Sequence, residues 1–173
     1  MADYYFKKGS LLKTKDIGVS GSNGLLIRNI QKRLFLGVGG ELLMKAFYLK
    51  RGYIINSPKD TKAHTGVCHL LGSIPDAELK DHDTFSFNAL VENMHHIATF
   101  DNQEDIKTGL IILRIFRNKE GHVVTRRHAY NPSFYRAIET ALVYFYEHGF
   151  SERLTMHISM EQRESGQFII RRT

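Results

Sequence analysis

The stretch Leu34-Phe-Leu-Gly-Val-Gly-Gly-Glu-Leu-Leu-Met44 lies within a longer segment, residues 25–52, whose apolar side chains recur every three or four positions. This period predicts a helix, and Gly52 is a suitable residue to end it. Gly37, Gly39 and Gly40 stand inside the expected helix, where each costs about 1 kcal/mol relative to alanine. We therefore expect a second helix to approach closely at these glycines. The apolar row consists of Ile27, Ile30, Leu34, Val38, Leu42, Ala46 and Leu49.

Three more helices are expected after a mixed loop region, residues 53–83, which also holds one short helix around Thr65–Leu71. Asp83-Thr84 can cap the first of them, and the second begins near Glu104. Asn131-Pro132 is typical of an N-cap followed by proline in the first turn, and Gly149 closes this third helix. Their apolar rows are Phe87, Leu90, Val91, Met94 and Ile97; Ile106, Leu110 and Leu113; and Phe134, Ile138, Ala141, Phe145 and His148.

The C-terminal residues follow a different pattern. Apolar residues alternate from Leu154 to Met160, a turn is expected at Glu164-Ser-Gly166, and Phe168–Ile170 can return as a second strand. We therefore expect a mainly all-α fold, an antiparallel helical bundle with a small C-terminal β-hairpin. The expected division is an N-terminal segment with a flexible loop, residues 1–24, the bundle, residues 25–149, and an extension, residues 150–173.

Composition and charge restrict the class of protein. The 173 residues contain 24 Lys and Arg against 18 Asp and Glu, a net charge of +6 that favours an anionic partner. A single cysteine, Cys68, excludes an internal disulfide framework and suits a reducing compartment. No apolar run approaches the ~18 residues of a membrane span, and the N-terminus does not have the order of a secretion signal. We expect a cytoplasmic protein without a membrane partner.

The chemistry-bearing segment is Gly109-Leu-Ile-Ile-Leu-Arg-Ile-Phe-Arg-Asn-Lys-Glu-Gly-His-Val-Val124. Extending its apolar row by four residues reaches Arg117, so a guanidinium is expected along the packing seam, where it is costly unless it is paired or functional. On an unbroken helix, five residues at about 100° each would place Arg117 and His122 about 140° apart. Either the helix ends at Gly121 and His122 folds back, or a second subunit completes the pair.

This segment resembles a known superfamily. Arg117-Asn-Lys-Glu-Gly-His122 is similar to the R-x4-6-H motif of HEPN domains, in which Asn often follows the Arg, and Leu36–Tyr53 resembles a helix of many bacterial HEPN proteins. The resemblance covers about residues 25–149. It implies a helical bundle that forms a homodimer and acts as a metal-independent endoribonuclease without a cofactor, as a toxin or phage-defence component whose partners are RNA and an antitoxin or other defence protein.

The residue types suit RNA cleavage through the 2′-hydroxyl. His122 can take or give a proton near neutral pH, and Arg117 can stabilise the charge on the phosphoryl oxygens. Asn118 either hydrogen-bonds the phosphate or orients His122. Some toxin-type HEPN proteins carry Tyr two residues after the His, where this chain has Val124, so that subfamily is a poor match.

Several residues have both a functional and a structural interpretation. A basic set, Arg114, Lys119, Arg126, Arg127 and His128, is either an RNA track or a solvated basic loop. Glu41 either pairs with Arg117 or Arg114 across the bundle or is solvated. No metal site is expected, because the adjacent His95 and His96 should diverge on a helix. A second group, His64, Cys68 and His69, would need a fourth ligand from elsewhere.

Three functions therefore remain open from the sequence. The first is an RNA-cleaving HEPN protein. The second is a non-catalytic HEPN-like module that binds RNA, a nucleotide or a protein partner. The third is a helical scaffold with an incidental basic loop.

Overall fold

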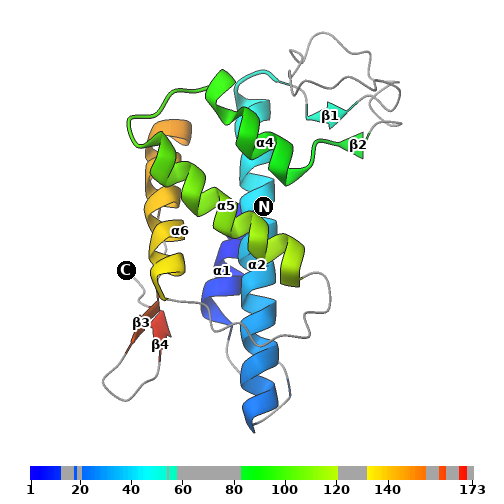
Figure 1. Ribbon diagram of the computed structural model, residues 1–173, viewed down its shortest axis with the longest axis vertical. Helices are drawn as coiled ribbons and strands as arrows, with labels where there is room; N and C mark the ends of the chain where they lie inside the picture. The colour runs from blue at the N-terminus through cyan, green and yellow to red at the C-terminus, as the bar shows by residue number, and fades with distance from the viewer. Residues whose placement is uncertain are drawn as a thin grey trace.

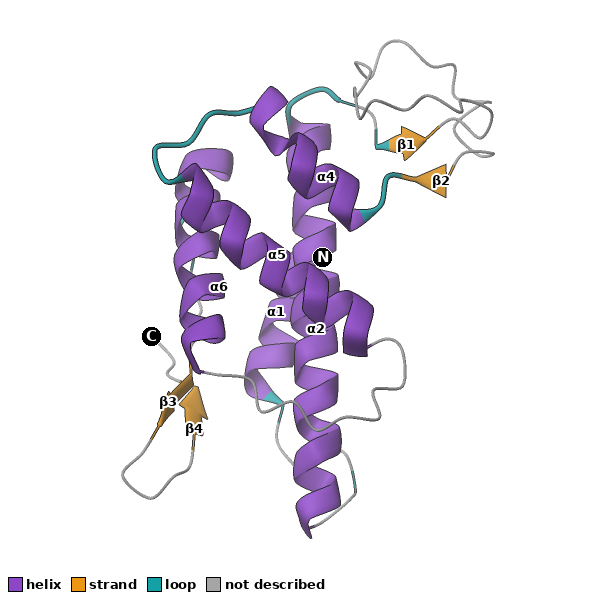
Figure 2. Cartoon of the chain, viewed as in Figure 1, coloured by secondary structure: helices purple, strands orange, loops and turns teal. Residues whose placement is uncertain are grey.

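The computed structural model describes residues 1–12, 18, 21–53, 55–57, 83–120, 132–154, 160–162 and 168–170. Helix α2, Gly21–Lys50, is the central element and runs along the length of the bundle (Figure 1). Helix α1, Ala2–Leu11, packs on one side of α2, and α5, Gln103–Glu120, crosses it. Helix α6, Pro132–Tyr144, packs against α5. The expected mainly helical fold is confirmed (Figure 2).

The buried side of α2 differs from the predicted apolar row. The row through Leu34, Val38 and Leu42 is half-buried, and Leu49 is exposed. Helix α1 and α5 instead cover other positions of α2, so its apolar residues lie on several sides of the helix. The buried residues are Gly24, Lys32, Arg33, Leu36, Gly37, Gly39, Gly40, Leu43, Met44, Phe47 and Tyr48.

The glycines of α2 mark close helix contacts, as predicted. A β-carbon on Gly39 would lie 2.8 Å from the ring of Phe6 in α1, and one on Gly40 would lie 2.9 Å from the side chain of Leu113 in α5. A β-carbon on Gly37 would overlap the backbone of Arg117. The absence of a side chain at these positions lets neighbouring helices approach, which offsets the low helix propensity of glycine.

The second close contact joins α5 to α6. A β-carbon on Gly109 would overlap the methyl group of Ala141 and lie 2.7 Å from the carbonyl oxygen of Ala137. Phe116, also of α5, is fully buried, and its ring centroid lies 5.7 Å from that of Tyr135 in α6. Gly109 and Phe116 therefore pack within the chain's own bundle.

The segment before α5 begins differently from the prediction. Asp83-Thr84 forms strand β2, which pairs antiparallel with β1, Asn56–Ser57. Helix α4, Phe87–Asn93, is capped by Ser86, whose Oγ accepts a hydrogen bond of 3.2 Å from the backbone nitrogen of Ala89. A short 3₁₀-helix, η3, Met94–His96, follows. The predicted helix around Thr65–Leu71 lies outside the described residues.

The ends of the chain complete the bundle. Proline begins α6 at Pro132 as predicted, but the helix continues through a π-helical stretch, η4, Phe145–Phe150. The stretch ends at Ser151, which has a left-handed φ of 56°, instead of at Gly149. The predicted C-terminal hairpin is confirmed in its pairing, because β3, Met160–Gln162, pairs antiparallel with β4, Phe168–Ile170. Its first strand begins only at Met160, the last residue of the predicted alternating row, and the predicted turn lies outside the described residues.

The N-terminal residues belong to the packed structure. Helix α2 begins at Gly21, four residues earlier than the predicted Leu25, so the expected loop through Gly24 is shorter. Phe6 of α1 is fully buried in the core, and the Tyr146 hydroxyl donates a short hydrogen bond to the carboxylate of Asp3. In the part of the chain that the structure describes, no helix is both long and apolar enough to cross a membrane.

Candidate functional site

Helix α5 carries the Arg117 motif at its C-terminal end. The helix is described as far as Glu120, and Gly121, where one of the two alternatives lets it end, lies outside the described residues. His122, two residues after Glu120, also lies outside the described residues. The buried row of α5 continues from Leu113 to Phe116, and Arg117 lies beside it.

Arg117 has a closely packed backbone and an accessible side chain. Its backbone lies directly against Gly37 of α2, at a distance that leaves no room for a β-carbon on the glycine. Its side chain is 47% exposed, and Nε donates a hydrogen bond of 2.8 Å to Oε2 of Glu41. The expectation of a guanidinium on the packing seam is therefore corrected: the backbone lies on the seam and the charged group emerges at its edge.

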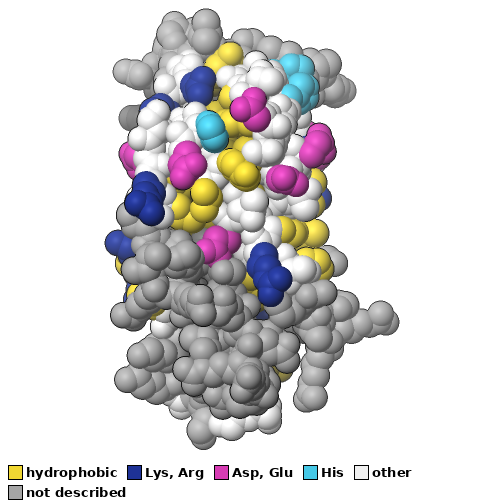
Figure 3. Space-filling view, turned by 90° about the vertical axis from the view of Figure 1, so that its left-hand side faces the viewer, with side chains coloured by type: hydrophobic (Ala, Val, Ile, Leu, Met, Phe, Trp, Pro, Cys, Tyr) yellow, Lys and Arg dark blue, Asp and Glu magenta, His cyan; other side chains and the backbone are white. Residues whose placement is uncertain are grey.

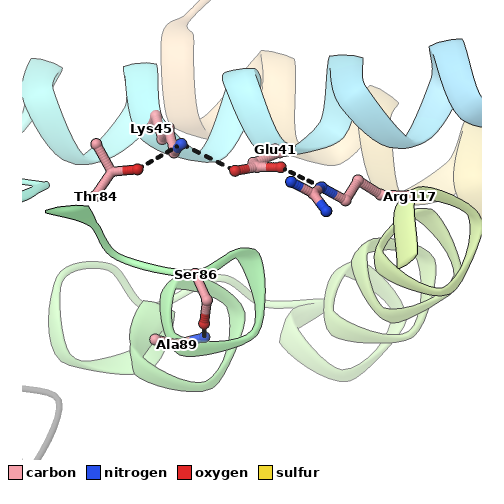
Figure 4. A network of polar contacts seen from close by, with 6 residues as sticks. All are labelled: Glu41, Lys45, Thr84, Ser86, Ala89 and Arg117. Carbon is pink, nitrogen blue, oxygen red and sulfur yellow. Dashed lines mark hydrogen bonds and ion pairs between the residues drawn. The ribbon is translucent and has the colours of Figure 1, made fainter. Parts of the chain in front are cut away.

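Glu41 binds Arg117 of α5 and Lys45 of its own helix, and Lys45 extends the network to β2. Oε1 of Glu41 lies 2.9 Å from Nζ of Lys45, which also donates a hydrogen bond of 3.0 Å to the hydroxyl of Thr84 in β2. Figure 4 shows Glu41 between the two cations, with Arg117 reaching it from α5. Of the two alternatives for Glu41, the structure favours the pair with Arg117 over a solvated side chain.

Burial and charge act in opposite directions on Glu41. Desolvation raises the pKa of its carboxyl, whereas the hydrogen bonds and positive charges of Lys45 and Arg117 lower it. The net effect is a pKa below the ordinary value, so Glu41 is ionised at neutral pH. One carboxylate between two cations leaves this cluster with a net positive charge. An anionic ligand is therefore attracted to it.

Glu41 binds the guanidinium of Arg117 through its Nε. Among the residues that the structure describes, no acceptor contacts its two terminal Nη nitrogens. These nitrogens belong to a planar fork that matches the oxygens of a phosphate. Arg117 is thus oriented from one side and available to an anion on the other.

The remaining predicted site residues are in part accounted for. Arg114, which was expected to contact RNA, donates a short hydrogen bond to Oδ1 of Asn88 in α4. Asn118 is exposed next to Arg117, and Lys119 belongs to α5. The side chain of Lys119 and the whole of Arg126, Arg127 and His128 lie outside the described residues.

A pocket of about 380 Å³ opens beside the ion pairs. Glu41, Lys45 and Arg117 form its charged wall, and α2 supplies an apolar wall. The apolar wall consists of Leu34, Val38 and Leu42. Three residues of the predicted apolar row of α2 therefore line the candidate site instead of the core.

The adjacent histidines depart from their predicted geometry. The ring centroids of His95 and His96, which lie in the 3₁₀-helix η3, are 3.8 Å apart, so the expected divergence of the two side chains is wrong. Within the described ranges, no group of three or more His, Cys, Asp or Glu residues is placed to hold a metal ion. His64, Cys68 and His69 lie outside those ranges.

The partners that join the site to the fold were not predicted from the sequence. Lys45 follows Glu41 by four residues, a spacing that pairs opposite charges on a helix and was a usable signal. Thr84 and Asn88 are contacts between elements distant in the sequence, for which a single sequence offers no comparable signal. A further omission is Lys32, whose Nζ is buried without a hydrogen-bond partner in the described structure.

Comparison of the chain with known protein families, with curated proteins and with solved structures finds no match.

Proposed function

We propose that the chain is a metal-independent endoribonuclease of the HEPN type, in which Arg117 binds the reacting phosphate, His122 transfers protons and Asn118 assists. The observation that supports this most strongly is the state of Arg117. Its guanidinium is held at Nε by Glu41, is half-exposed beside a pocket, and stands five residues before His122. A fixed and accessible cation is what a phosphate in the transition state requires.

The proposed reaction uses the RNA itself as the nucleophile. The ribose 2′-oxygen forms a bond to phosphorus while the bond from phosphorus to the 5′-oxygen breaks, which gives a 2′,3′-cyclic phosphate and a 5′-hydroxyl. One proton leaves the 2′-hydroxyl and one reaches the 5′-oxygen, and His122 is the group suited to this transfer. Arg117 stabilises the charge that develops on the phosphoryl oxygens.

The biological setting of the proposal rests on the resemblance to HEPN proteins. A homodimer brings two Arg117 motifs together across a two-fold axis. This arrangement supplies a second His122 to the phosphate. The corresponding role is that of a cytoplasmic toxin or phage-defence component with an antitoxin or other defence protein as partner.

Incubation of the purified chain with single-stranded RNA in excess EDTA tests the proposal. We expect cleavage that persists in the chelator, and its loss in Arg117→Ala. Arg136→Ala is the matched control, because Arg136 is an exposed arginine on α6. Intact RNA after prolonged incubation with the wild-type chain would contradict the proposed activity.

One observation favours a second candidate, an HEPN-like module that binds RNA, a nucleotide or a protein without cleaving. Glu41 already engages both Arg117 and Lys45, in a network that ties α2 to α5 and β2. Such a network stabilises a binding surface even where no bond is broken. RNA binding without cleavage in the same assay would select this function.

A further inference from the structure

A second groove lies between α1 and α2, apart from the Arg117 pocket. Its volume of about 790 Å³ is roughly twice that of the pocket beside Arg117. Residues of both helices form its walls, and they are Tyr4, Lys7, Lys8, Leu11, Leu12, Gln31, Leu34 and Phe35. The groove therefore has an aromatic and apolar surface with basic side chains at its edge.

The described residues of this groove carry charge of one sign. Two lysines line it, and none of its eight described lining residues is acidic. The face of the molecule that carries α6 is different, because acidic and basic side chains alternate over its described part (Figure 3). A polyanion is therefore attracted to the groove more strongly than to the α6 face.

Tyr4 offers a flat aromatic surface in this groove. Its side chain is 57% exposed, a high value for a tyrosine next to apolar neighbours. Nζ of Lys8 lies 5.6 Å from the centroid of the Tyr4 ring, so a cation accompanies the aromatic face. Aromatic rings beside positive charge are the recurring elements of sites for single-stranded nucleic acid, in which bases stack and phosphates contact the cations.

The groove and the Arg117 pocket are neighbours on α2. Leu34 lines both of them, so the two adjoin at this residue. Gln31 in the groove and Glu41 in the pocket are ten residues apart on α2, which corresponds to about 15 Å along the helix axis. A ligand that extends from Arg117 along α2 therefore reaches Tyr4 and the two lysines.

We infer that the groove between α1 and α2 is a binding subsite for the single-stranded RNA next to the reacting phosphate, with one base stacked on Tyr4 and backbone phosphates at Lys7 and Lys8. This inference rests on the proposed function for its ligand. Stacking and charge do not read base identity, so the subsite increases affinity for RNA of any sequence. The contribution of the subsite to affinity also depends on the length of the RNA, because a fragment confined to the Arg117 pocket does not reach Tyr4.

The test measures the binding of labelled single-stranded oligoribonucleotides, about 4 to 16 nucleotides long, to the full chain carrying His122→Ala. Tyr4→Ala is expected to weaken binding of the longer oligonucleotides about 5- to 150-fold, whereas Tyr4→Phe keeps the ring and should bind like the parent. Lys7→Gln with Lys8→Gln is expected to reduce the slope of log affinity against log salt by ~0.7 per lost phosphate contact. Tyr144→Ala and Lys107→Gln, on other helices, are the controls, and circular dichroism checks folding.

The outcomes separate this inference from the proposed function. If the groove variants lose affinity but the wild-type chain does not cleave RNA, the subsite stands and the endoribonuclease proposal fails. If the wild-type chain cleaves RNA and the groove variants bind RNA as tightly as their His122→Ala parent, the subsite is refuted and the activity stands. RNA that does not bind at all refutes both. A change of sedimentation in Tyr4→Ala with unchanged RNA affinity would assign the groove to a protein partner and overturn the inference.

Discussion

Two cations of the bundle, Arg117 and Lys32, occupy opposite environments. Arg117 is half-exposed and bonded to Glu41, whereas Lys32 is 1% exposed and its Nζ has no hydrogen-bond partner among the described residues. Nζ of Lys32 instead lies 5.3 Å from the centroid of the Tyr135 ring. A charge at the edge of the core, such as Arg117, can be held by a partner and remain accessible to solvent. A charge inside the core makes stability depend on pH.

The pKa of Lys32 reflects its burial. Burial lowers the pKa of Lys32 from 10.5 to about 7, and the nearby charges of Arg28 and Arg33 contribute in the same direction. Between these two pH values the unfolded chain binds a proton at Lys32 that the folded chain has released. The free energy of unfolding therefore rises with pH across this window. Below pH 7 the folded state carries the full cost of a buried charge.

The largest expected effect concerns the site. Arg117→Ala and His122→Ala are each expected to reduce RNA cleavage by about 10²- to 10⁴-fold, because the first removes charge stabilisation and the second removes proton transfer. Thermal unfolding of Arg117→Ala should change little, because an exposed ion pair contributes about 0–1 kcal/mol. Cleavage rates and melting temperatures check both statements, with Arg136→Ala as control. If a variant unfolds, its residue is structural. If a variant retains full activity, its residue takes no part in the chemistry.

The next effect concerns Lys32. Lys32→Met keeps the side-chain length and removes the buried charge, so it should stabilise the fold by about 3 kcal/mol near pH 6. This gain is the cost of burying the charge minus the attraction between the charge and the Tyr135 ring. Denaturant unfolding at pH values from about 6 to 10 measures this gain, which should shrink as the pH rises through the window above. Lys107→Met, at a surface pair, is the control. A gain that does not vary with pH would refute the buried-charge explanation.

A smaller effect is expected where Arg117 meets α2. Gly37→Ala raises helix propensity but places a methyl group in the backbone of Arg117, so we expect a net loss of about 1–3 kcal/mol. Gly39→Ala should cost less, because it meets the ring of Phe6, which can shift, in place of backbone. Urea unfolding of the two variants compares them directly. Equal stabilities would show that the α2–α5 contact is not limited by this glycine.

The smallest expected effect concerns the proposed homodimer. If each site requires His122 from both subunits, an equal mixture of wild-type and His122→Ala chains should retain about one quarter of the activity after subunit exchange, because one quarter of the dimers are then wild type. Independent sites would retain one half. Activity of a species that sediments as a monomer would also contradict the shared site.

The sequence predicted the features that depend on local chemistry. The stop of α2 near Gly52 and proline at the start of α6 follow from backbone preferences of single residues. Close approach at Gly37 was also predicted, because a glycine in a helix is otherwise unfavourable. The pair of Glu41 with Arg117 was one of two open alternatives.

The sequence did not predict features that depend on which neighbours meet. Helix α2 is covered by α1 and α5 on different sides, and glycines form part of its buried face. The spacing of large apolar residues therefore predicted the wrong buried row, the one through Leu34 and Val38. The cap at Ser86 was missed because Asp83 and Thr84 have the same capping chemistry but pair with β1. Lys32 was missed because nothing in its local sequence indicates burial.

The central claim is that the Arg117 motif cleaves RNA through the 2′-hydroxyl. The most direct measurement is an end-group analysis of RNA treated with the wild-type chain in excess EDTA, together with the same RNA carrying 2′-deoxyribose at the cleaved positions. The claim predicts 2′,3′-cyclic phosphate and 5′-hydroxyl ends, no cleavage at the deoxy positions, and no product with Arg117→Ala. Cleavage at the deoxy positions, or products with 5′-phosphate ends, would contradict it.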